Sequence, residues 1–101
     1  MTEKVKVADV KDIAQGTSKY VEVAGKKIAI FNVNGEFFAI SNTCTHAGGP
    51  LADGFLAGEV VTCSWHGFEF DVKTGQCLTN PSLGIEKYKV VVENDEVFIE
   101  V

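Results

Sequence analysis

The chain has 101 residues, of which 46% are hydrophobic and 23% are charged, and its formal net charge at pH 7 is −5. This length predicts one domain with a modest core, and the composition is ordinary for a globular protein. The negative charge argues against nucleic acid as a partner, because phosphates would repel it. No apolar run approaches the ~18 residues of a membrane span, and the first residues lack the pattern of a secretory signal.

The first half of the chain predicts short strands separated by turns. Residues 9–13 predict a single helical turn before Gly16, and Gly25 marks a turn. Asn34-Gly35 lies between two apolar runs and is the strongest short signal for a β-hairpin. Strands are expected over residues 5–10, 20–23, 28–33 and 37–40.

The second half continues the pattern. Asp53-Gly54 and Gly58 break the stretch between the two halves of the strand pattern. A turn is expected at 73–75, and a loop follows at 79–82. Strands are expected over residues 59–63, 68–71, 87–92 and 97–101, the last two forming a hairpin. Regular short strands without a convincing amphipathic helix predict an all-β, antiparallel sandwich or barrel.

Two short motifs pair a thiol with an imidazole. They are Cys44-Thr45-His46 and Cys63-Ser64-Trp65-His66, and the sixteen residues 47–62 separate them. Both histidines of the chain and two of its three cysteines lie in these motifs. An odd number of cysteines, with two already assigned, argues against a disulfide framework and for a reducing cytoplasm.

A single Cys or His is more often buried in a core than bound to a metal, but four in mirrored doublets indicate a metal site. Two Cys and two His could hold one structural zinc ion. However, zinc fingers pair like residues in each doublet, whereas each doublet here is mixed. Two facing hairpin loops would instead place the cysteines deeper, on an inner iron, and the histidines nearer the tips, on an outer iron. Zinc remains the alternative at this point.

The pattern C-T-H, sixteen residues, C-S-W-H-G resembles the binding motif of the Rieske [2Fe–2S] proteins, in which two His replace two Cys on one iron. The resemblance extends from about Val21 to the C-terminus. It implies that Cys44, His46, Cys63 and His66 bind one [2Fe–2S] cluster. It also implies a single Rieske domain over residues 1–101, with a small cluster-binding subdomain, about residues 42–72, at one end of the sandwich or barrel.

Departures from the family's respiratory members imply a lower reduction potential. Those members carry a further cysteine in each ligand loop, where this chain has Gly49 and Trp65, so the bridging disulfide cannot form. They also carry a serine and a tyrosine that donate hydrogen bonds to sulfur, where this chain has Phe68 and Phe70. We therefore expect a potential on the order of −150 to 0 mV, in the lower part of the Rieske range.

Other residues near the motifs have two interpretations each. Gly48, Gly49 and Gly67 predict turns and would let backbone N–H groups approach the sulfides. Trp65 is expected either to cover the cluster or to be buried in the core. Pro81 resembles the proline of the loop that covers the cluster in this family, or else stiffens a turn. Cys77 is expected to be a small buried hydrophobic residue.

The resemblance implies an electron carrier and not an enzyme. We expect a low-potential, soluble, monomeric Rieske ferredoxin that passes electrons from a flavin-dependent reductase to a terminal oxygenase, as a component of a dioxygenase system, through transient docking. The alternative is a Rieske-like small subunit of a larger oxidoreductase such as nitrite reductase. A structural zinc module with the same fold is the third possibility.

Overall fold

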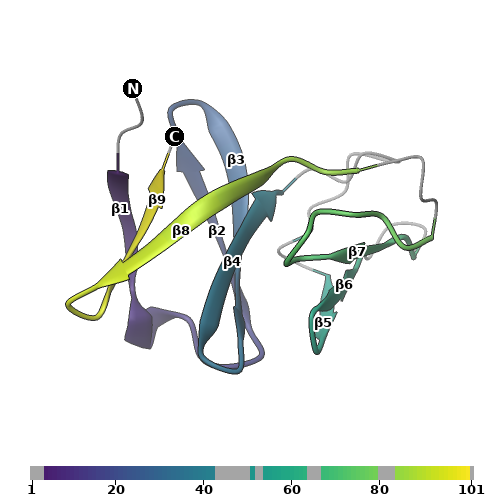
Figure 1. Ribbon diagram of the computed structural model, residues 1–101, viewed down its shortest axis with the longest axis horizontal. Helices are drawn as coiled ribbons and strands as arrows, with labels where there is room; N and C mark the ends of the chain where they lie inside the picture. The colour runs from purple at the N-terminus through teal and green to yellow at the C-terminus, as the bar shows by residue number, and fades with distance from the viewer. Residues whose placement is uncertain (1–3, 43–50, 52–53, 64–66, 80–83, 101) are drawn as a thin grey trace.

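The computed structural model describes residues 4–42, 51, 54–63, 67–79 and 84–100. Within these ranges the chain is built mainly from antiparallel β-strands, with a short 3-10 turn, η1 (Val10–Asp12), and 3-10 conformation also at Leu51. The strands form two sheets that lie side by side (Figure 1). The expected all-β, antiparallel architecture is confirmed.

The larger sheet has six strands in the order β1-β9-β8-β4-β3-β2. The edge strands β1 and β2 approach each other, so the sheet nearly closes into a barrel. The first and last strands are neighbours, with Lys4 opposite Glu100. The strands are β1 (Lys4–Asp9), β2 (Ser18–Val23), β3 (Lys26–Val33), β4 (Glu36–Ser41), β8 (Lys87–Glu93) and β9 (Glu96–Glu100).

The smaller sheet has three strands in the order β5-β6-β7. These are β5 (Phe55–Ala57), β6 (Val60–Thr62) and β7 (Glu69–Asp71). Figure 1 shows this sheet at the end of the molecule away from the β8–β9 turn. It falls inside the range 42–72 expected for a subdomain, whose boundaries stay a prediction.

Tight turns connect the strands of the larger sheet. At the β3–β4 turn, Asn34 has φ 52° and Gly35 has φ 89°. Two consecutive positive φ values are required by a type I′ hairpin turn, and Asn-Gly adopts them at low cost. Asn94 and Asp95 do the same between β8 and β9, with φ of 51° and 61°. Both predicted hairpins are confirmed.

Strand β3 is buried on both faces because it lies between two apolar clusters. Along it, Ile28 and Ile30 face one cluster, and Ala29 and Phe31 face the other, as the two-residue period of a strand requires. The first cluster fills the space enclosed by the strands of the larger sheet and includes Ile13, Val97 and Ile99. The second joins the larger sheet to the smaller one and includes Ile40, Leu51, Val61, Cys63, Phe70, Val72 and Cys77.

One local expectation is confirmed, and one strand was missed. The helical turn expected over 9–13 is a 3-10 turn over Val10–Asp12, in which the Asp12 carboxylate accepts a hydrogen bond from the Asp9 N–H at 3.0 Å. Strand β5 was not expected, because a segment of three residues between Gly54 and Gly58 is too short to show alternation. None of the helices in the described ranges has the length and apolar character needed to cross a membrane.

Candidate metal centre

Cys63 follows the last residue of β6 and is almost completely buried, with 1% of its surface exposed. Its N–H donates a hydrogen bond of 2.7 Å to the carbonyl of Phe68. This bond continues the β6–β7 register, in which Thr62 lies opposite Glu69. Cys63 and Phe68, which lie on either side of the second motif's last residues, are therefore held opposite each other.

The residues that flank the first motif, Asn42 and Leu51, are also joined by a backbone hydrogen bond. The Leu51 N–H donates to the Asn42 carbonyl at 2.7 Å, and the Asn42 N–H donates to the Lys27 carbonyl at 2.9 Å. Leu51 itself is fully buried. Asn42 is thus attached to the start of β3 in the larger sheet.

Gly54 brings the bases of the two loops together. Its N–H donates to the Leu51 carbonyl at 3.0 Å, and a Cβ added to it would lie 2.3 Å from the Thr62 carbonyl oxygen. Only glycine allows this approach. Thr62, the residue before Cys63, therefore lies directly against Gly54, which follows the first motif in the chain.

Leu51, Cys63 and Phe68 share one apolar cluster, so both loops start from the same water-poor base. A thiolate is a soft ligand that suits iron in an iron–sulfur site. Two Cys and two His in the loops make up the donor set of a Rieske cluster. The buried thiol and the joined loop bases fit such a cluster.

The other predicted ligands, Cys44, His46 and His66, lie outside the described residues, as do Gly48, Gly49, Trp65 and Pro81. The described residues contain no group of three or more His, Cys, Asp or Glu side chains that could hold a metal ion. The structure thus positions one predicted ligand, Cys63, and the bases of both loops. Gly67 has φ 72°, which agrees with its predicted place in a turn.

Cys77 confirms its predicted role as a small buried residue. It is fully buried, forms an isolated bridge with Phe70, and lies in the same cluster as Cys63.

Sequence reasoning missed three residues that shape the site. Asn42, Leu51 and Gly54 close the first loop and connect it to the second. Each is a common residue type whose role depends on contacts distant in the sequence. The one available signal in the sequence is the glycine after Asp53, which by itself predicts only a break between strands.

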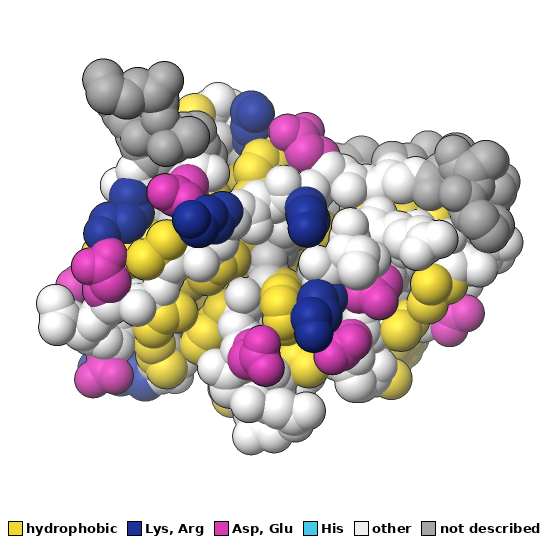
Figure 2. Space-filling model, in the orientation of Figure 1, with side chains coloured by type: hydrophobic (Ala, Val, Ile, Leu, Met, Phe, Trp, Pro, Cys, Tyr) yellow, Lys and Arg dark blue, Asp and Glu magenta, His cyan; other side chains and the backbone are white. Residues whose placement is uncertain are grey.

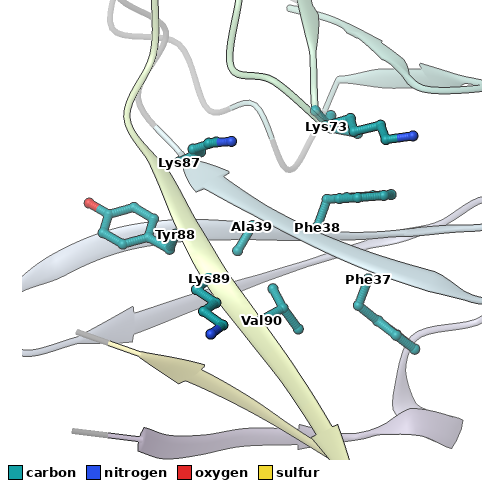
Figure 3. Close-up of a pocket in the computed structure, with 9 residues that line it drawn as sticks. Phe37, Phe38, Ala39, Lys73, Lys87, Tyr88, Lys89 and Val90 are labelled. Atoms are coloured by element: carbon teal, nitrogen blue, oxygen red, sulfur yellow. The ribbon is translucent and has the colours of Figure 1, made fainter. Parts of the chain in front are cut away.

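A groove between β4 and β8 is a separate feature (Figure 3). It has a volume of about 470 Å³, and Phe38 and Val90 form part of its apolar lining, with Lys73, Lys87 and Lys89 around them. Burial, and to a lesser extent the carboxylate of Glu86, raise the pKa of Tyr88 in its wall. Ammonium groups do not ligate iron, so this groove is not the metal centre.

The described residues form a small all-β protein, and the sequence carries the two Cys and two His of a Rieske donor set. The chain belongs to the Rieske [2Fe–2S] domain family, whose model matches residues 3–89. It accordingly binds one [2Fe–2S] cluster and is an electron carrier, not an enzyme.

Two curated relatives are ferredoxin components of naphthalene dioxygenase systems. The one from Ralstonia sp., of naphthalene 1,2-dioxygenase/salicylate 5-hydroxylase systems, is 41% identical over 90 residues, covering 88% of this chain and 86% of the relative. The one from Pseudomonas putida is 38% identical over 102 residues, covering 99% and 98%.

Solved structures give the same picture. A chain in the complex of reduced oxygenase and oxidized ferredoxin of carbazole 1,9a-dioxygenase matches with a TM-score of 0.89 at 33% identity, covering 95% of this chain and 91% of that one. A putative nitrite reductase small subunit from Mycobacterium tuberculosis matches with a TM-score of 0.92, covering 100% and 96%, but at 17% identity, which shows the fold alone.

Proposed function

We propose that Cys44 and Cys63 bind one iron of the cluster and that His46 and His66 bind the other. The observation that carries this assignment is the buried thiol of Cys63 at the joined bases of the two loops. When bound, a cluster of this kind supplies a centre that takes up and releases one electron.

The described residues around Cys63 hold the thiol in place and keep water from it. The hydrogen bond from the Cys63 N–H to Phe68 fixes the backbone, and Leu51 and Phe68 pack in the same cluster. Low polarity strengthens electrostatic effects on a buried redox centre. Because the loop bases are fixed, little rearrangement should accompany a change of charge.

The protein serves as the ferredoxin component of an oxygenase system, between a flavin-dependent reductase and a terminal oxygenase. Its relatives are named as ferredoxin components of dioxygenase systems, and a similar solved ferredoxin chain occurs in a complex with an oxygenase. Docking is transient, as suits a carrier that must leave each partner. The protein is a soluble cytoplasmic monomer, and its net charge of −5 favours partners with basic patches.

The test starts from the purified protein under anaerobic conditions. NADH and the reductase of the Pseudomonas putida naphthalene 1,2-dioxygenase system should bleach its visible absorption, and the oxygenase of that system should restore it. Analysis should find two irons and two sulfides per chain. One zinc ion without sulfide would contradict the cluster, and bleaching without reoxidation by the oxygenase would contradict the proposed acceptor.

A small subunit of a nitrite-reductase-type enzyme is the second candidate, and the observation in its favour is the shared fold. A stable complex with a large partner during purification would favour it. Weak, reversible binding favours the ferredoxin.

A further inference from the structure

The small sheet buries one face and exposes the other. On its inner face, Leu56, Val61, Phe70 and Cys77 lie in register and pack in the cluster around Cys63. The residue pairs one position away belong to the opposite face, because side chains alternate along a strand. Phe55 pairs with Thr62, Thr62 pairs with Glu69, and the Leu78 N–H donates to the Glu69 carbonyl at 2.8 Å.

These four residues form a row across the outer face, which we call the outer row: Phe55, Thr62, Glu69 and Leu78. Its two ends are large apolar side chains, with Phe55 exposed by 74% and Leu78 by 45%. Three strand spacings separate its ends, a width of about 14 Å. Figure 2 shows hydrophobic and acidic side chains on the surface at this end of the molecule.

The outer row has one charge. Glu69 makes none of the ion pairs that the structure describes, although the nearby Lys73 and Glu59 face each other at 4.0 Å. The neighbouring Asp71 carboxylate is occupied, since it accepts hydrogen bonds from the N–H groups of Lys73 at 2.8 Å and Thr74 at 3.3 Å. The row therefore offers a carboxylate between two apolar groups, which complements a Lys or Arg surrounded by apolar side chains.

The outer row also lies next to the metal centre. Thr62 directly precedes Cys63 in the chain. Phe68, which directly precedes Glu69, accepts a hydrogen bond from the Cys63 N–H. A partner bound to this row would therefore contact residues that are adjacent in the chain to Cys63 and Phe68. A surface of this width fits the small interfaces of transient redox complexes, which bury less than about 1,200 Å² in total.

From these observations we infer that the outer face of the small sheet, with Phe55 and Leu78 as apolar anchors and Glu69 as the charged contact, docks the oxygenase that accepts the electron. The oxygenase is preferred to the reductase because a similar solved ferredoxin chain occurs in complex with an oxygenase. This inference rests on the proposed function.

The test measures binding of the cluster-containing protein to the oxygenase of the Pseudomonas putida naphthalene 1,2-dioxygenase system by calorimetry. Phe55→Ala and Leu78→Ala should each raise Kd about five- to tenfold, the effect of losing an interface anchor. The matched control is Val92→Ala, because Val92 is 47% exposed but lies in β8 of the larger sheet. It should change Kd by less than about twofold.

Two further readouts sharpen the result. Glu69→Gln should flatten the dependence of the association rate on ionic strength, whereas Glu36→Gln, at an exposed position of β4, should not. Hydrogen–deuterium exchange should show slower exchange of Phe55–Ala57 in the complex. All variants should keep the visible spectrum and iron content of the unchanged protein, since the outer row lies outside the core.

Unchanged Kd in Phe55→Ala and Leu78→Ala, or an equal loss in Val92→Ala, would overturn the docking surface while leaving the proposed function in place. Variants that impair reduction by the reductase but not oxygenase binding would also overturn it. Failure of the unchanged protein to bind the oxygenase or pass electrons to it would instead overturn the proposed function, and the inference with it.

Discussion

Cys63 and Cys77 are both fully enclosed in the cluster that joins the two sheets, yet they stand at different places in the fold. Cys63 is the first residue after β6, at the base of a loop. Cys77 forms a bridge to Phe70 within the sheet. Burial alone therefore does not distinguish the proposed ligand Cys63 from Cys77, whereas their positions in the fold do.

The first prediction compares these two thiols. Cys63→Ala should abolish cluster binding, because it removes one of the four proposed ligands, and the protein should lose its colour. Cys77→Ala should cost about 1 kcal/mol of stability, as is usual for a core substitution, and keep full iron content. Iron and sulfide analysis checks both. Equal iron in the two variants would contradict the ligand assignment.

The second prediction concerns Phe68, which lies opposite Cys63. Cross-strand Cβ atoms are about 4.5–5.5 Å apart, so a serine hydroxyl at 68 would lie within reach of the thiolate. One such hydrogen bond contributes about 0.5–1.5 kcal/mol, which for one electron corresponds to about 20–65 mV. Phe68→Ser should therefore have a higher potential than Phe68→Ala in a redox titration. Equal potentials would show that the hydroxyl makes no such bond.

Among single residues, those whose role depends on their spacing in the sequence could be predicted from the sequence alone. The thiol–imidazole doublets predicted the family, and the burial of Cys77 followed from its lack of a partner at a useful spacing. Asn42, Leu51 and Gly54 could not be predicted, because their roles arise from contacts between segments. The coordination by Cys44, His46 and His66 stays a prediction.

Among the structural elements, the connection between the two loops depends on Gly54. An alanine there would place its Cβ 2.3 Å from the Thr62 carbonyl oxygen, so the backbone at residue 54 or at the end of β6 must shift. The third prediction is that Gly54→Ala lowers the free energy of unfolding by about 1–3 kcal/mol, as overpacking does, and reduces cluster content.

The matched control for this prediction is Gly84→Ala. Its added Cβ would lie 3.8 Å from the Gly75 carbonyl oxygen, an ordinary contact. Urea denaturation and iron analysis should therefore show little change in this variant. Similar losses in both variants would mean that the approach of Gly54 to Thr62 is not what joins the loops.

Strands with clear alternation or turn chemistry were predicted well, whereas the order of strands was not. Asn34-Gly35 specified its hairpin through local backbone geometry. By contrast, β5 is three residues long, and the pairing of β1 with β9 joins the two ends of the chain. Local patterns hold no information on such distant pairings.

For the molecule as a whole, alkaline pH should reduce stability. The pKa of Tyr88 is raised above 10.0, mainly by burial and then by Glu86, and the pKa of Lys6 is raised above 10.5 by hydrogen bonds to Glu96 and Asp9. A raised folded-state pKa stabilises the fold fully below the unfolded-state pKa. That contribution is lost as the pH rises through the folded-state value.

The fourth prediction is that Tm falls as the pH rises above about 10 and that Tyr88→Phe makes the fall less steep, because phenylalanine does not ionise. Thermal unfolding of the two proteins between pH 8 and 11, followed by circular dichroism, checks this. A parallel fall in both proteins would show that Tyr88 does not contribute to the alkaline loss.

The pairing of β1 with β9 has a practical consequence. Lys4 and Glu100 face each other across two adjacent strands, and Figure 1 shows both chain ends on the side away from the small sheet. A linker added at either end would leave the small sheet pointing outward. The protein could thus be tethered to an electrode, or its two ends joined and new ones opened at the Asn94-Asp95 turn, with its electron-transfer end still accessible.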